Sequence, residues 1–354
     1  MCCKGIATFT RLRGACCGQL RSDFSTVVFP VANRVHRMTF WDLLRRVAGR
    51  ARRLIIGDYV LVKRAATQPW HHLETMRQRI VGGLMAVRFS NIPADFFVDA
   101  RSDLAARALA DGNYEPEIVS LLPHLPDEGD FINVGANIGI IAVATLLAGP
   151  KRRVVCIEPV PECVALLERN LTHAGVRSRA AVISGAAGAT TEGTVTLFTV
   201  PGRPEYTSCG PLVHASVEGA HSHVVQATRV TIDGVAAAHT LQVTAIIMDC
   251  EGGELHVLQG AQDVLHQHRP LVILEVDDRM LRANGASSHE LLRLLAQWGY
   301  ACRNVATFLP IQDEAFVGTV IAAHSSSEPD LFSRFATREN LAAVAVAETE
   351  GSGR

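Results

Sequence analysis

Residues 130–139 read DFINVGANIG, in which an apolar strand runs directly into a glycine-punctuated turn and then an apolar helix. Gly135 lacks a Cβ, so we expect the backbone there to approach a ligand closely. We expect Gly139 to let the following helix pack against the strand. This strand, turn and helix predict an α/β fold in which a small molecule lies across the turn.

A second strand indicates which kind of molecule binds. VVCIEP at residues 154–159 ends near Glu158, where an acidic residue of an open α/β sheet often accepts hydrogen bonds from the ribose of a nucleoside cofactor. A dinucleotide would call for G-x-G-x-x-G, but Gly135 and Gly139 are separated by three residues, and no Lys-Ser/Thr pair follows. The pattern favours S-adenosylmethionine, while a tight turn without a ligand is the alternative reading of the glycines alone.

Carboxylates follow two further apolar strands. Residues 245–261 read AIIMDCEGGELHVLQGA and place Asp249, Glu251 and Glu254 around a Gly-Gly pair. Residues 269–276 read RPLVILEV and approach their end at Glu275. Because open α/β sheets bind ligands at the carboxyl ends of their strands, we expect these acids to serve the site.

At this point the chain resembles the FkbM-type S-adenosylmethionine-dependent methyltransferases over residues 112–323. The segments that carry the resemblance are YEPEIVSLL at 114–122, NVGANIG at 133–139, IEP at 157–159, VTIDGV at 230–235, and the two blocks just quoted. The resemblance implies an O-methyltransferase that acts on a hydroxyl of a sugar, glycolipid or polyketide-type acceptor. It also implies that Tyr114 and Glu115 close over the cofactor, although these residues would equally suit the start of a helix.

Two positions depart from the family pattern. The family commonly has Asp where this chain has Asn133, and often has Lys where this chain has Ile247. Asn keeps an acceptor but lacks the negative charge that would favour a cationic cofactor. We therefore expect a lower cofactor affinity here, and a cofactor-binding domain without catalysis remains an alternative. A nucleotide-dependent oxidoreductase is a further alternative, which the missing second G-x-G glycine disfavours.

The predicted fold is a class I methyltransferase, Rossmann-like sheet of seven mostly parallel strands with helices on both faces. Strands are expected at 131–134, 154–157, 181–184, 245–248, 271–274, 300–305 and 316–322, the last an antiparallel insertion. Helices are expected at 115–125, 138–147, 160–173 and 289–298. Residues 194–200 and 224–232 alternate like strands with one solvated face, and the stretch between them is expected to be a long loop over the acceptor.

We expect the cofactor site to combine residues from the leading helix, the glycine turn and the next two strand ends. Its predicted members are Tyr114, Glu115, Asn133, Gly135, Ala136, Asn137, Gly139, Glu158, Ser184 and Ala186.

The chemistry requires a group that activates the acceptor, because an alcohol is a poor nucleophile at neutral pH. Asp249 is the first candidate for the base, Glu251 the second, and Glu275 would assist by binding a metal or orienting the acceptor. Glu251 would serve equally well as a helix cap, and Glu254 is expected to be a first-turn helix charge. A required Mg²⁺ is not favoured, because Asp249 and Glu275 do not make a six-oxygen site even with Asp277 or Asp278.

Charge is distributed unevenly along the 354 residues. Residues 1–90 hold 16 Lys and Arg against 4 Asp and Glu, whereas the remainder holds 18 against 31. A helix at 39–55 places its arginines largely outside one apolar face, so it would lie on an anionic membrane surface or cover the acidic domain. No nucleic-acid partner is expected, and the sequence leaves the oligomeric state open.

Domain bounds follow from these contrasts. We predict a disordered segment at 1–37, a basic helical extension at 38–110, the methyltransferase domain at 111–324 and a tail at 325–354, with Met38 an alternative start. No apolar run reaches the length of a membrane span, and the nine cysteines lack paired spacing, so a cytoplasmic enzyme, peripheral to the membrane if the basic helix binds lipid, is expected.

Overall fold

The computed structural model describes residues 26–28, 37–39, 83–110, 112–209, 221–311, 315–327 and 332. The chain divides into two units, residues 1–55 and 56–354. In the first unit, β1 (Thr26–Val28) pairs antiparallel with β2 (Arg37–Thr39). The disordered segment expected at 1–37 and the basic helix expected at 39–55 lie almost wholly outside the described residues.

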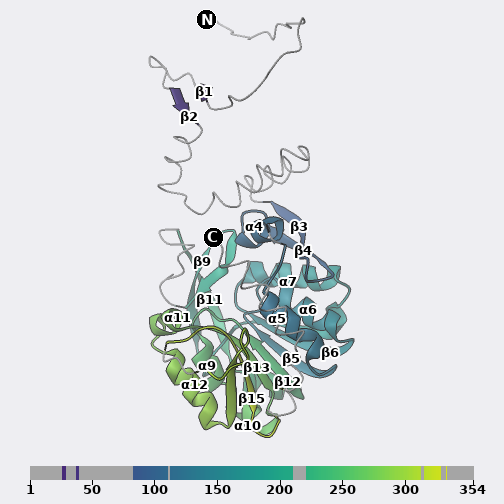
Figure 1. Ribbon diagram of the computed structural model, residues 1–354, viewed down its shortest axis with the longest axis vertical. Coiled ribbons are helices and arrows are strands. Elements are labelled where there is room, and N and C mark those ends of the chain that lie inside the picture. Colours follow the sequence, from purple (N-terminus) through teal and green to yellow (C-terminus); the bar gives the residue numbers. More distant parts are fainter. Residues whose placement is uncertain are drawn as a thin grey trace, which may run out of the picture. The chain divides into compact units, whose positions relative to one another are not determined.

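A seven-stranded sheet forms the centre of the second unit (Figure 1). Its order is β14-β15-β13-β12-β5-β6-β7, with β15 antiparallel to both of its neighbours and the other pairings parallel. The predicted fold class, including the antiparallel insertion, is therefore confirmed. The strands are β5 (Glu128–Val134), β6 (Lys151–Glu158), β7 (Ala180–Ser184), β12 (Val243–Met248), β13 (Leu271–Asp277), β14 (Tyr300–Asn304) and β15 (Val317–His324).

Alternate side chains of these strands enter two separate cores. Ile247 packs with the core on one face of the sheet, whereas its neighbour Ile246 packs on the other, as the period of two requires. The first face is covered by α5 (Pro116–Leu121), the 3₁₀ turn η1 (Leu122–His124), α6 (Ile140–Ala148) and α7 (Pro161–His173). The second is covered by α8 (Ile232–Ala238), α9 (Glu254–Gln259), α10 (Gln262–Gln267), α11 (Asp278–Ala283) and α12 (Ser288–Gln297).

A second sheet contains four strands in the order β10-β9-β11-β8. They are β8 (Ala186–Ala187), β9 (Thr194–Val200), β10 (Arg203–Ser208) and β11 (His223–Val230). The sequence predicted β9 and β11 but assigned β10 to a loop. β10 pairs antiparallel with β9, and this tertiary pairing outweighs the weak strand preference of RPEYTS.

The described end of the predicted helical extension is largely a hairpin. β3 (Leu84–Arg88) pairs antiparallel with β4 (Asp95–Asp99), and only then does α4 (Asp103–Ala110) begin. Both strands alternate between buried and more exposed residues, the period-two pattern that favours strand over helix. These residues join the core on the α6 side of the sheet, so the helical extension predicted at 38–110 is corrected to a hairpin over residues 84–99.

Asn170 of α7 connects the hairpin to the main sheet unit. Its side chain is fully buried, accepts the N–H of Phe97 at 2.7 Å and donates to the carbonyls of Phe97 and Ile138 at 3.2 and 2.8 Å. One amide group thus satisfies backbone groups of β4 and of the turn before α6.

Arg152 is a buried cation in the same core, with 1% of its surface exposed. Its guanidinium donates to four carbonyls, those of Leu122, Leu125, Pro126 and Thr145, at 2.8 to 3.2 Å. It also lies over the Phe131 ring, 5.0 Å from the centroid. Burial lowers the pKa of Arg152. The side chain therefore holds the segment after α5 against β6 and α6.

Candidate functional site

The carboxyl ends of β5, β6 and β12 meet at one point of the sheet. The N–H groups of Gly135 and Ala136 both donate to the carbonyl of Ile157, at 3.0 and 3.1 Å, and the N–H of Asp249 donates to the carbonyl of Val134 at 3.1 Å. The chain passes from β5 outward to β7 and then returns to β12 on the other side of β5. Such a reversal is where open α/β sheets bind their ligands.

Each glycine of the turn lies against a part of the protein that the sequence analysis did not predict as its neighbour. Gly135 has φ +70°, and a Cβ there would lie 1.8 Å from the carbonyl oxygen of Asp249. Gly139 has φ +88°, and a Cβ there would lie 2.4 Å from Leu167 of α7. The close neighbour of Gly135 is therefore the end of a second strand, and that of Gly139 is a second helix.

We expect Gly135→Ala to weaken binding of S-adenosylhomocysteine by about tenfold or more, because an L residue at positive φ costs about 1 kcal/mol and the Asp249 carbonyl must also move. Isothermal titration measures the affinity. Gly175→Ala is the matched control: Gly175 has φ +72°, but nothing lies within 4 Å of the point that a Cβ would occupy there. Equal affinities for the two variants would show that contact with Asp249 does not shape the site.

Glu158 is fixed by the backbone around it. Its two carboxylate oxygens accept the N–H groups of Asn137 at 2.8 Å and Val160 at 2.9 Å, and the residue is 5% exposed. Each carboxylate oxygen keeps further acceptor capacity. The geometry suits the predicted contact with a ribose.

The acidic turn after β12 is organised by Glu254. Its Oε1 accepts the N–H groups of Cys250 at 2.9 Å and Gly252 at 3.2 Å, and the residue is 2% exposed. Helix α9 begins after Gly253 with no side-chain cap hydrogen bond, and the charge interaction with the helix dipole considered for Glu251 stays a prediction. Glu254 is a first-turn residue, as expected, but it is buried and it closes the turn.

Two pockets adjoin at this edge of the sheet. The inner pocket lies over the glycine turn and reaches Glu158 and Ala186; the outer pocket reaches α4, Glu275 and Val317. They share seven lining residues: Tyr114, Glu115, Ile118, Asn137, Glu205, Asp249 and Glu251. A group bound in the inner pocket would therefore meet a group bound in the outer pocket across a largely acidic wall.

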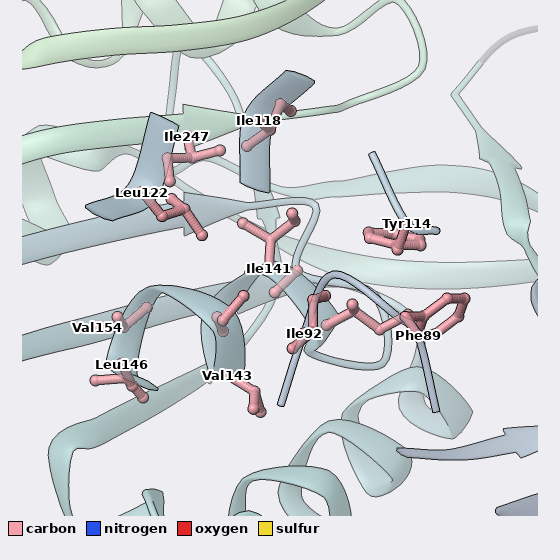
Figure 2. Packing of buried hydrophobic residues seen from close by; sticks show 14 of the residues in the cluster. Phe89, Ile92, Tyr114, Ile118, Leu122, Ile141, Val143, Leu146, Val154 and Ile247 are labelled. Carbon is pink, nitrogen blue, oxygen red and sulfur yellow. The ribbon is translucent and has the colours of Figure 1, made fainter. Parts of the chain in front are cut away.

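Packing behind this wall is apolar. Figure 2 shows Phe89, Ile92 and Tyr114 grouped together, with Ile118 and Ile141 nearby. The rings of Phe89 and Tyr114 have centroids 5.3 Å apart, and the Asn91 side chain pairs with both backbone groups of Tyr114 at 2.7 and 3.1 Å. The hairpin that the sequence did not predict thus supports one wall of both pockets.

Most predicted site residues line the pockets. Asp249 and Glu251 line both, and Glu275 lines the outer pocket alone. Ser184 and Gly139 line neither of these two pockets; Ser184 is exposed, and the positions after it, Gly185 to Ala187, face the inner pocket instead. The other predicted cofactor residues line the inner pocket: Tyr114, Glu115, Asn133, Gly135, Ala136, Asn137, Glu158 and Ala186.

Several lining residues come from segments that the sequence left unassigned. Glu205 of β10 lines both pockets; its Oε1 accepts the N–H of Asp103, and its Oε2 is buried without a partner among the described residues. Asp103 and Arg107 of α4 line the outer pocket. The only local signal for Glu205 was its position in the stretch expected to cover the acceptor.

Three residues other than glycine adopt left-handed backbone conformations around these pockets. Glu115, Asn137 and Glu251 have φ of 35°, 48° and 50°. Such conformations cost of order 1 kcal/mol each and occur often at functional sites. Here each one places a polar residue on the shared wall.

Crowding and burial raise the pKa values of the site carboxylates. Burial raises the pKa of Glu115, Glu158 and Glu205 to about 7 in each case. The charge of Asp249, followed by burial, raises the pKa of Glu275 to about 7. Burial, followed by neighbouring carboxylates, also raises the pKa of Asp249 and of Glu251. The wall is therefore only partly ionised at neutral pH without a bound cation.

The inner pocket offers two buried acceptors to a polar ligand. Asn133 Oδ1 and Asn137 Oδ1 are buried without hydrogen-bond partners in the described part of the chain, so both are acceptors that a bound donor would satisfy. Within the described residues, the Asn133 side chain donates to the Ile247 carbonyl at 3.4 Å. The described residues contain no group of three or more His, Cys, Asp or Glu side chains that could hold a metal ion. None of the described helices is long and apolar enough to cross a membrane.

Residues 133–302 match the Methyltransferase FkbM domain family. Among solved structures, the FkbM methyltransferase of Methylobacillus flagellatus is similar over 63% of this chain, with 18% identity and a TM-score of 0.35. This chain spans 55% of that protein. An O-methyltransferase of Bacillus cereus, in complex with S-adenosylhomocysteine, is similar over 62% of this chain and 86% of its own, with 11% identity and a TM-score of 0.36. Comparison with curated proteins gives no match.

Proposed function

Because residues 133–302 are an FkbM-type, S-adenosylmethionine-dependent methyltransferase domain, we propose that the chain methylates a hydroxyl of a sugar, glycolipid or polyketide-type acceptor. S-Adenosylmethionine supplies an electrophilic methyl group on a sulfonium, which is a good leaving group. The protein's task is then to orient the acceptor and to take its proton.

The observation that carries this proposal is the shared wall. Asp249 and Glu251 line both pockets, so a carboxylate stands where a cofactor in the inner pocket and an acceptor in the outer pocket would meet. Holding two reactants in line contributes on the order of 7 kcal/mol or more to a bimolecular transfer. Asp249, at the end of β12, would take the hydroxyl proton, with Glu251 the second candidate.

The remaining roles follow from position. Glu158 would accept hydrogen bonds from the ribose hydroxyls, since backbone N–H groups already fix both of its carboxylate oxygens. Asn133, Asn137, Tyr114 and Glu115 would contact the rest of the cofactor from the other sides of the inner pocket. Glu275, which lines only the outer pocket, would orient the acceptor.

The direct test incubates the purified chain with isotopically labelled S-adenosylmethionine and with extracts of sugars and glycolipids. Mass spectrometry should find a product that is heavier by one labelled methylene. Its labelled methyl group should be bonded to an oxygen, as a methyl ether. Label on nitrogen or carbon would contradict the hydroxyl acceptor. Binding of S-adenosylhomocysteine without labelling of any extract would count against the proposed acceptor classes.

Cofactor affinity should depend on pH with a defined sign. Glu115 and Glu158, which line the inner pocket, have raised pKa values of about 7, and a cationic sulfonium favours their ionised forms. From pH 8 to pH 6 these groups gain protons, so the dissociation constant of S-adenosylmethionine should rise by about tenfold for each carboxylate that must ionise. Isothermal titration at several pH values measures this rise.

S-Adenosylhomocysteine is the control ligand, because it keeps the ribose and lacks the sulfonium charge. Its dissociation constant should rise less than that of S-adenosylmethionine between pH 8 and pH 6. Parallel changes for both ligands would mean that the carboxylates do not respond to the charge on sulfur.

A further inference from the structure

The outer pocket has an unbalanced charge. Nine carboxylate residues and two arginines line it. Arg279 is already paired with Asp277 at 2.6 Å, and Asp103 lies 3.8 Å from Arg203. The carboxylates nearest the shared wall, including Glu254 and Glu275, have no ion pair among the described residues.

Two of these carboxylates also have an unused buried oxygen. Glu254 is 2% exposed; its Oε1 accepts two backbone N–H groups, whereas its Oε2 has no partner in the described residues. Glu205 has the same asymmetry, with Oε1 bound to the Asp103 N–H and Oε2 without a partner there. A buried acceptor without a donor is destabilising, so each oxygen favours a ligand that brings N–H or O–H groups.

We propose, on the basis of the proposed function, that the acceptor in the outer pocket is a polyol that carries an ammonium group, such as an amino sugar, and that anionic acceptors are excluded. An ammonium group supplies three donors and a positive charge, and positive charges are far fewer than carboxylates in this pocket. Phosphate or carboxylate in the same place would meet carboxylates at close range, and like charges there are strongly unfavourable.

The observations favour an organic cation over a metal ion. No group of three or more potential ligands in the described part of the chain is placed to hold a metal, whereas the carboxylates are spread over α4, β10, the turn before α9 and the end of β13. Such spacing suits hydroxyl and ammonium groups on an extended ligand better than a single ion. The raised pKa of Glu275, about 7, has the charge of Asp249 as its main cause and reports the same repulsion.

The test compares three sugars that share a pyranose ring and differ in charge: glucosamine, glucose and glucuronate. The full chain is saturated with S-adenosylhomocysteine at pH 7 and titrated with each sugar, with binding followed by ligand-observed NMR. Glucosamine should bind at least about tenfold more tightly than glucose, and glucuronate should show no saturable binding. Equal binding of glucosamine and glucose, or binding of glucuronate, would overturn the proposal.

Two variants test whether the preference for glucosamine arises in the outer pocket. Glu275→Gln should reduce the glucosamine preference by several fold, whereas Glu192→Gln, an exposed glutamate that lines neither pocket, should leave it unchanged. Equal loss in both variants would overturn the assignment to this pocket. Displacement of glucosamine by millimolar Mg²⁺, beyond that caused by NaCl of equal ionic strength, would assign the carboxylates to a metal and likewise overturn it.

The same titrations separate this inference from the proposed function. The saturation step itself measures S-adenosylhomocysteine binding. If S-adenosylhomocysteine does not bind, the proposed function fails and this inference fails with it. If it binds and glucosamine is not preferred, only the inference about acceptor charge fails.

Discussion

Asp249→Asn should lower kcat by about 10²- to 10⁴-fold, the range that a positioned general base contributes. The N–H of residue 249 would still donate to the Val134 carbonyl, so the turn should keep its geometry. The amide side chain has nearly the same shape but no basic oxygen. Initial rates at saturating S-adenosylmethionine and acceptor, once one is found, measure the change.

The free energy of unfolding shows whether Asp249→Asn loses activity because the base is missing or because the protein is unfolded. Burial, followed by repulsion from Glu115 and Glu254, raises the pKa of Asp249, so removing its charge should leave the free energy of unfolding unchanged or slightly increased. Asp263→Asn, at an exposed position of α10 outside both pockets, is the matched control and should keep full activity. A fully active Asp249→Asn enzyme would transfer the role of base to Glu251.

Arg152→Met should reduce the free energy of unfolding by about 3 to 5 kcal/mol, because four carbonyls lose a buried donor at once. Met has a similar length and no polar atom to satisfy them. The carbonyls of Leu122, Leu125 and Pro126 belong to one short segment, so that segment should detach first. Urea denaturation followed by circular dichroism measures the total effect.

Lys151→Ala is the control for Arg152→Met. Lys151 precedes Arg152 on β6, and its side chain is 70% exposed with a loose ion pair of 3.9 Å to Glu128. Its loss should change the free energy of unfolding by less than about 1 kcal/mol. If the two variants unfold at the same urea concentration, the buried guanidinium contributes no more than a surface lysine.

The central sheet could be predicted because its signals are local. Strands such as residues 245–248 are uninterrupted apolar runs, as expected for parallel strands covered on both faces, and the observed β12 (Val243–Met248) extends that prediction by two residues. Glu158 and Asp249 could be singled out because each lies at or just after the end of such a strand. Their place in the pockets follows from topology, while their chemical roles stay predictions.

The rest of the site depends on tertiary contacts that no local pattern encodes. Glu205 reaches the shared wall because β10 pairs with β9 and the N–H of Asp103 fixes its carboxylate. Asn91 supports Tyr114 across 23 positions of the chain. Gly135 could be recognised as a necessary glycine, but its neighbour, the Asp249 carbonyl, follows a strand more than a hundred residues further along the chain.

The left-handed backbones of Glu115, Asn137 and Glu251 carry a consequence for efforts to make the enzyme more heat-resistant. Introducing glycine at any of the three would relax the main chain locally, yet it would also remove a polar side chain from the wall that both pockets share. The same three backbone conformations therefore affect both the stability of the fold and the shape of the proposed site. Stabilising substitutions are better sought at positions remote from this edge of the sheet.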